Sequence, residues 1–166
     1  MTFAGLDDIL NLAEDLLKHT IKQIIENNLP ELEYLEKYSQ KQLISELKKI
    51  IKINFARITY AESLEILAND KSKFIYNEIK WGMDLQSEHE KYLCQHFDNS
   101  PVFVINYPAE IKAFYMKNNP DHKTVASFDL LFPQIGEMIG GGMREDNYQF
   151  LKKKAQKAGL DIDNLS

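Results

Sequence analysis

Residues 127–145 read SFDLLFPQIGEMIGGGMRE, and this stretch predicts two β-strands joined by a turn at Pro133-Gln134. Asp129 precedes the turn and Glu137 follows it. Because facing positions on a hairpin lie roughly 5 Å apart, one register of the two strands brings these carboxylates together. Two converging carboxylates can hold Mg²⁺ against phosphate oxygens, so the hairpin is a candidate metal and phosphate site.

Glycines gather in the second half of the same stretch. The chain has seven glycines, and four of them are Gly136, Gly140, Gly141 and Gly142. Glycine in a strand often marks a place where a ligand approaches the backbone. Arg144 then offers a rigid fork of hydrogen-bond donors. The pattern predicts a pocket for a phosphate–metal ligand and a small polar group, although a glycine-bulged hairpin beside a surface charge cluster explains it equally well.

Short β-branched and aromatic segments precede the hairpin. Separated by Pro and Asn, they predict at least four consecutive strands in an antiparallel sheet. Lys112 lies between apolar neighbours in one of them, so it either faces the surface or points into an anionic or polar pocket. The predicted strands are Pro101–Tyr107, Ile111–Met116, Thr124–Phe132 and Ile135–Met143.

The first hundred residues predict helices instead. Asp7 or Asp8 caps a first helix that ends near Asn27, and a second pattern covers about 30–53. Capping boxes start two further helices at Thr59 and Ser87, and His89 is expected on a solvated face. Helices followed by strands favour an α+β fold in one domain, residues 1–166. Its parts are a helical half (6–97), a sheet half (101–144) and a closing helix (145–159).

Composition limits the possible functions. The 166 residues are 44% apolar and 27% charged, which is ordinary for one soluble globular domain. The net charge of −5 gives no general attraction to nucleic acid. The single cysteine, Cys94, fits a reducing cytoplasm as a small apolar helix residue. The sequence shows neither a membrane span nor a signal peptide.

Four segments follow one another as in the asparaginyl-tRNA synthetases. They are Phe55–Leu67 (FARITYAESLEIL), Trp81–Leu93 (WGMDLQSEHEKYL), Asn106–Met116 (NYPAEIKAFYM) and Asp129–Arg144 (DLLFPQIGEMIGGGMR). The resemblance covers nearly the whole chain. It implies an internal segment of a class II aminoacyl-tRNA synthetase catalytic domain, with an antiparallel sheet flanked by helices.

The same resemblance implies substrates and residue roles. Glu137 would bind ATP and Mg²⁺, Asp129 would support the metal, and Arg144 would read the asparagine side chain. Lys112, where its strand position points it into the pocket, is a further candidate contact for the amino acid. The full-length enzyme would be a cytoplasmic homodimer that makes an aminoacyl-adenylate and charges tRNA(Asn).

The chain also departs from the family pattern. Gly142-Met143 stands where similar enzymes usually show Ser-Gln before the arginine. The family's second and third signature motifs are expected before Met1 and after Ser166, and its first motif, through which the family dimerises, is also expected upstream. Arg57 and Arg144 are the chain's two arginines. With Arg144 assigned to the amino acid, no pair of arginines remains for phosphate, so the segment alone is expected to be inactive.

Other readings of these residues stay open. An aspartate-type ligase or an ATP-dependent asparagine synthetase would use the same fold. A truncated synthetase paralogue that acts as a non-catalytic binding module is the alternative from a different functional class.

Overall fold

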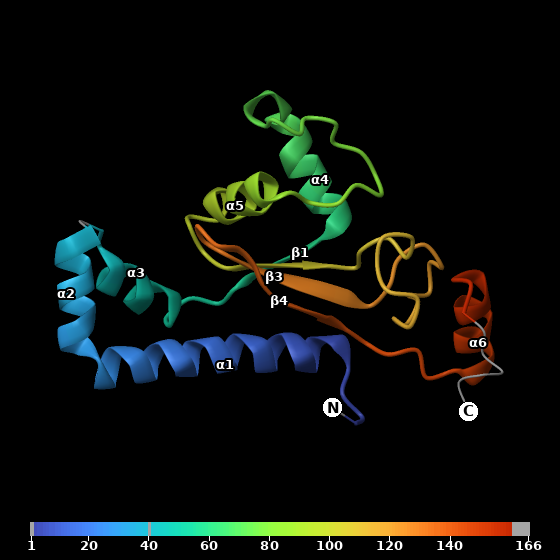
Figure 1. The fold of residues 1–166 in the computed structure, drawn as a ribbon, viewed down its shortest axis with the longest axis horizontal. Coiled ribbons are helices and arrows are strands. Elements are labelled where there is room, and N and C mark those ends of the chain that lie inside the picture. Colours follow the sequence, from blue (N-terminus) through green and yellow to red (C-terminus); the bar gives the residue numbers. More distant parts are fainter. Residues whose placement is uncertain (1, 40, 161–166) are drawn as a thin grey trace. The chain divides into compact units, whose positions relative to one another are not determined.

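The computed structural model describes residues 2–39 and 41–160 of the chain (Figure 1). The chain divides into two compact units, Met1–Phe55 and Ala56–Ser166. Among the described residues, no helix is both long and apolar enough to cross a membrane. The single catalytic domain expected from the sequence stays a prediction.

The first unit is made of helices. α1 spans Leu6–Asn27, α2 spans Leu29–Ser39 and α3 spans Leu43–Ile50. The single helix predicted for 30–53 is therefore wrong, because the backbone at Gln42 leaves the helical region (ψ 56°). The Glu36 carboxylate accepts the Ile44 N–H at 3.1 Å and so satisfies an amide at the new helix start.

Apolar residues at helical spacing form the core of this unit, and one carboxylate is buried beside them. Glu14 is 8% exposed, and it accepts from Lys18 Nζ at 2.6 Å and from the Phe55 N–H at 3.3 Å. Partners on both sides make this buried charge tolerable. The buried apolar residues are Leu10, Ala13, Ile21, Leu32, Ile50 and Phe55.

The second unit contains one sheet in the order β1-β2-β3-β4. Its strands are β1 (Ala56–Thr59), β2 (Val102–Ile105), β3 (Ser127–Phe132) and β4 (Gly136–Gly142). The predicted α+β class is confirmed. The β2–β3 and β3–β4 pairs are antiparallel, as predicted, while β1, which was not predicted as a strand, runs parallel to β2.

The predicted strand Ile111–Met116 is not a strand. The segment consists mainly of turns, and among the described residues its β-pairing is the single isolated bridge of Met116 with Arg144. The Met116 N–H closes one turn on the Ala113 carbonyl at 3.0 Å, which removes that donor from any ladder. Lys112 thus extends from a turn beside the hairpin.

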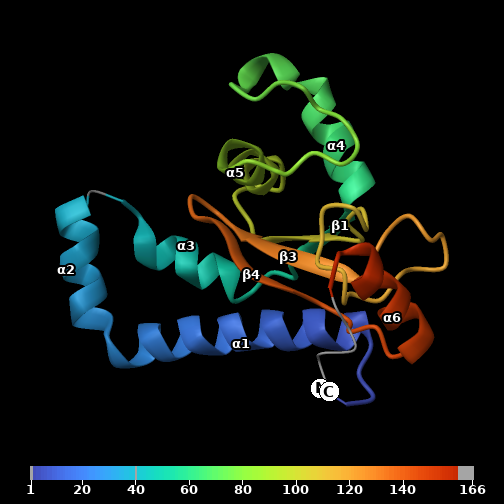
Figure 2. The same cartoon turned by 45° about the vertical axis from the view of Figure 1, so that its right-hand side comes forward.

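α4 (Tyr60–Asn69) and α5 (Ser87–His96) cover one face of this sheet, as Figures 1 and 2 show. Cys94 is fully buried between them and the strands, and burial raises the pKa of its thiol to about 12, which confirms a packing role. The core comprises Ile58, Tyr60, Leu67, Phe74, Leu93, Cys94, Val102, Val104, Tyr107 and Leu131.

The helix caps only partly follow the predictions. Thr59 Oγ1 accepts the Glu62 N–H at 3.2 Å and Glu62 Oε2 accepts the Thr59 N–H at 2.7 Å, which confirms that capping box. A short 3₁₀ turn, Lys71–Lys73, follows α4. The closing helix is shorter than predicted: α6 spans Tyr148–Lys157, and Asn147 caps it.

The second predicted box is displaced by one residue. Gln86, not Ser87, precedes the helix, and its N–H donates to His89 Nδ1 at 3.1 Å. The imidazole therefore carries its proton on Nε2, which donates to the Tyr76 carbonyl at 2.8 Å. His89 is fully buried, so the prediction that it faces solvent is wrong.

Candidate functional site

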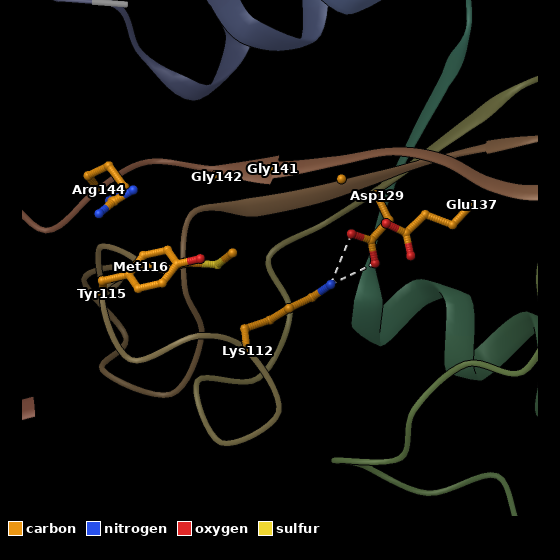
Figure 3. Close-up of a pocket in the computed structure, with 9 residues that line it drawn as sticks. Lys112, Tyr115, Met116, Asp129, Glu137, Gly141, Gly142 and Arg144 are labelled. Carbon is orange, nitrogen blue, oxygen red and sulfur yellow. Dashed lines mark hydrogen bonds and ion pairs between the residues drawn. The ribbon is translucent and has the colours of Figure 1, made fainter. Parts of the chain in front are cut away.

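A cavity of about 420 Å³ lies beside the β3–β4 hairpin. One wall is the hairpin itself, and the other is the turn segment that carries Lys112, Tyr115 and Met116 (Figure 3). All four sequence-predicted site residues line this one cavity. Its lining consists of Lys112, Tyr115, Met116, Asp129, Glu137, Gly140, Gly141, Gly142 and Arg144.

The two predicted carboxylates meet at one end of the cavity, but not as facing strand partners. Asp129 pairs with Gly140, while Glu137 pairs with Leu131 beyond a β-bulge. A Cβ at Gly140 would lie 2.5 Å from Glu137 Oε1 and 3.3 Å from Asp129 Oδ1. The missing side chain at Gly140 is therefore what lets both acids share this space.

Lys112 points into the cavity rather than to the surface. Its Nζ donates to both oxygens of Asp129, at 2.9 and 2.7 Å (Figure 3). The same Nζ lies 4.0 Å from the centre of the Tyr107 ring. Asp129 is 8% exposed, so this pair neutralises a nearly buried charge. Burial, and then the negative charge of Asp129, raise the pKa of the Tyr107 hydroxyl.

Glu137 stays unpaired at the same end. No side chain among residues 2–39 and 41–160 donates a hydrogen bond to its carboxylate. Partial burial raises the pKa of Glu137, the charge of Asp129 raises it further, and the ammonium of Lys112 lowers it. A cation brought to this end would relieve both unfavourable effects.

The donor set fits one divalent cation only in part. The described residues contain no group of three or more His, Cys, Asp or Glu side chains able to hold a metal ion. Asp129 already has Lys112 on both oxygens. The free carboxylate of Glu137 is the better Mg²⁺ ligand, since this ion usually takes one or two carboxylates and completes its shell with water and phosphate.

Arg144 marks the opposite end of the cavity (Figure 3). Its guanidinium lies 4.2 Å from the centre of the Tyr115 ring, which holds it by a cation–π contact. Backbone bonds fix the residue on both sides, from the Lys117 N–H to Met143 O and from the Glu145 N–H to Tyr115 O, each 2.8 Å. The donors of this guanidinium have no partner in the described part of the chain, so they are available to an acceptor.

Two contributions to the site were missed by sequence reasoning. Tyr115 gave no signal beyond its place in an aromatic segment, because a stacking partner depends on the fold. Glu90 on α5 accepts the Glu137 N–H at 3.1 Å, and its place one residue after His89 in a charged helix did not distinguish it from a surface acid.

Comparison with known proteins assigns the chain to a family. The sequence profile of the tRNA synthetases class II (D, K and N) matches residues 1–165. The chain belongs to this family. Similar proteins include the asparagine–tRNA ligase of Ureaplasma urealyticum serovar 10, at 46% identity over 99% of this chain and 37% of that protein. The asparagine–tRNA ligase of Borreliella burgdorferi is also 46% identical, over 100% of this chain and 36% of that protein.

Solved structures of class II synthetases also match the fold. The asparaginyl-tRNA synthetase from Pyrococcus horikoshii, crystallised with asparaginyl-adenylate, superposes with a TM-score of 0.83 at 34% identity. The match covers 98% of this chain and 35% of that one. The chain thus spans little more than a third of the length of its class II synthetase relatives.

Proposed function

We propose that this chain forms part of the asparagine and ATP pocket of an asparagine–tRNA ligase. The observation that carries the proposal is that Glu137 and Arg144 line the two ends of one cavity. The likeness to a synthetase crystallised with asparaginyl-adenylate supports it. That complex pairs an amino acid with a nucleotide, and the cavity has one end suited to each.

The Arg144 end takes the asparagine side chain. The carbonyl of a carboxamide only accepts hydrogen bonds and a guanidinium only donates them, so the two groups match. Tyr115 limits the positions of the guanidinium through its 4.2 Å contact. Lys112 also lines the cavity and contributes a positive charge, most of which is neutralised by its ion pair with Asp129.

The acidic end takes ATP together with Mg²⁺. Glu137 would hold the ion, and Asp129 would support it from its pair with Lys112. Bound Mg²⁺ supplies positive charge where negative charge builds up on phosphate as the asparagine carboxylate attacks and pyrophosphate leaves. The glycines of β4 keep side chains out of the space above the strand, so a flat ligand can lie against the backbone.

The whole ligase would transfer the activated asparagine to tRNA(Asn) and would act as a cytoplasmic homodimer. The 166 residues alone are expected to bind these ligands weakly and to catalyse nothing. They span only 37% of the Ureaplasma urealyticum ligase and, with Arg144 assigned to the amino acid, leave no pair of arginines for phosphate. One such electrostatic contact is worth about 10²–10³ in rate.

Asparagine-dependent ATP–pyrophosphate exchange tests the proposal. The assay compares residues 1–166 alone with a chimera in which they replace the matching part of the Ureaplasma urealyticum asparagine–tRNA ligase. We expect exchange by the chimera with asparagine and not with aspartate, and none by the segment alone. Exchange driven by aspartate would overturn the choice of amino acid, and robust exchange by the isolated segment would overturn its inactivity.

Arginine variants of the chimera test the residue assignment. Arg144→Ala should reduce exchange by at least about 10²-fold, since it removes a charged donor that the substrate needs. Arg57→Ala is the matched control, because Arg57 is the chain's other arginine and lies on β1 outside the cavity. An equal effect of the two changes would contradict the role of Arg144.

A further inference from the structure

The backbone at Glu137 is directed by a helix as well as by its own sheet. The β3–β4 register shifts between Leu130 and Leu131, where the strand bulges. At this bulge the Glu137 N–H donates to Glu90 Oε2 on α5 at 3.1 Å. A bulge turns a side chain away from the regular alternation of its strand. A side chain of α5 therefore fixes the backbone N–H of Glu137, and with it the direction in which the Glu137 side chain leaves the strand.

The conformation of the preceding residue, Gly136, also leaves room for the Glu90 carboxylate. Gly136 has φ +99°, a conformation that favours glycine, and a Cβ placed there would overlap Glu90 Oε2. α5 packs against both β3 and β4, and this packing fixes the helix backbone that carries Glu90. Two consecutive hairpin residues, Gly136 and Glu137, thus accommodate one helical side chain.

We infer that Glu90 is a positioning residue, which fixes the direction in which the Glu137 carboxylate enters the cavity. Its link to catalysis rests on the proposed function, but the positioning itself does not. The Glu90 carboxylate positions Glu137 through its hydrogen bond and not through its charge, because the negative charges of the Glu90 and Glu137 carboxylates repel each other. Burial raises the pKa of Glu90, while the bond from the Glu137 N–H lowers it.

Three variants of the 166-residue chain separate the hydrogen bond from the charge and from general stability. Glu90→Gln keeps an oxygen acceptor and removes the charge, and Glu90→Ala removes both. Glu88→Ala is the matched control, because Glu88 lies on the same helix and accepts the Ile75 and Tyr76 N–H groups at 3.0 and 2.7 Å, away from the cavity.

NMR measurements on each variant test positioning directly. Amide exchange reports the Glu137 N–H, and three-bond couplings report whether the Glu137 side chain keeps one χ1 rotamer. We expect the Glu137 amide to exchange about 10- to 100-fold faster in Glu90→Ala, the equivalent of a bond to a charged acceptor, with averaged couplings. Glu90→Gln and Glu88→Ala should keep the couplings of the unchanged chain.

A titration with Mg²⁺–ATP, followed at the Glu137 carboxyl resonance, separates this inference from the proposed function. No shift in the unchanged chain would count against the proposed nucleotide site and leave the positioning result intact. The inference is overturned if Glu90→Ala leaves the Glu137 couplings unchanged, or if Glu88→Ala averages them equally.

Discussion

The ion pair between Lys112 and Asp129 lies in the lining of the candidate site. Both side chains are largely buried, at 20% and 11% exposed, and Lys112 reaches both carboxylate oxygens. Removing one member of a buried pair leaves the other charge without compensation, and that penalty exceeds the net worth of the pair. The pair itself therefore adds little to the free energy of unfolding, but removing one of its two charges should lower that free energy strongly.

Lys112→Met should lower the free energy of unfolding by about 2–4 kcal/mol, because Asp129 is left buried and charged. Urea denaturation of the chain measures this. Lys117→Met is the matched control: the Lys117–Asp146 pair has the same 2.7 Å distance but is 36% and 72% exposed, so its loss should lower stability far less than Lys112→Met does. Equal losses in the two variants would show that Asp129 is not effectively buried.

At the residue scale, the sequence singled out Asp129, Glu137, Arg144 and Lys112, and all four line one cavity, while their binding roles stay predictions. Sequence reasoning failed where contacts between distant segments decide. His89 was assigned to a solvated face. Its burial depends on Phe74, whose ring stacks edge-on at 4.9 Å from a distant loop, and no local pattern reports that.

At the scale of elements, two glycines of β4 serve different purposes: Gly142 is needed for the packing of the sheet, and Gly140 leaves room for the Glu137 carboxylate. At Gly142 a Cβ would lie 2.8 Å from the Ala126 carbonyl oxygen, which is backbone and cannot move aside cheaply. At Gly140 the obstacle is the flexible end of Glu137, 2.5 Å away. The same substitution at the two positions should therefore have different consequences.

Gly142→Ala should destabilise the chain by about 1–3 kcal/mol, the usual cost of overpacking. Gly140→Ala should change stability by less than about 1 kcal/mol, yet weaken Mg²⁺–ATP binding by displacing the Glu137 carboxylate. Thermal denaturation and calorimetric titration measure the two effects. Loss of stability at Gly140 with unchanged binding would contradict this division.

The elements themselves were predictable to the extent that their signals are local. The hairpin, β2 and the Thr59 capping box follow from alternation, turn residues and cap chemistry, and they are present. Ile111–Met116 has the composition of a strand, but a strand needs a partner ladder, and the segment closes turns on itself instead. β1 was missed because its four residues are completed by parallel pairing with β2, 46 positions along the chain.

At the scale of the whole molecule, β1 and β4 each have one neighbour in the sheet of the described residues. β1 is only four residues long, which limits its use as a template. β4 is seven residues long, has Met138 at 38% exposure, and carries one charged side chain, Glu137. An edge with few charges tends to pair with another chain.

We therefore expect the 166-residue chain to associate as its concentration rises, measured by light scattering. Met138→Lys should reduce this association, because a lysine on an edge strand opposes strand-to-strand pairing. Leu35→Lys is the control: Leu35 is 50% exposed on α2, so it loses a similar apolar surface without altering an edge. A chain that stays monomeric over the whole concentration range would contradict the prediction. Pairing through β4 would be affected by Met138→Lys alone. An equal reduction of association by both lysine variants would therefore show that general surface hydrophobicity causes it.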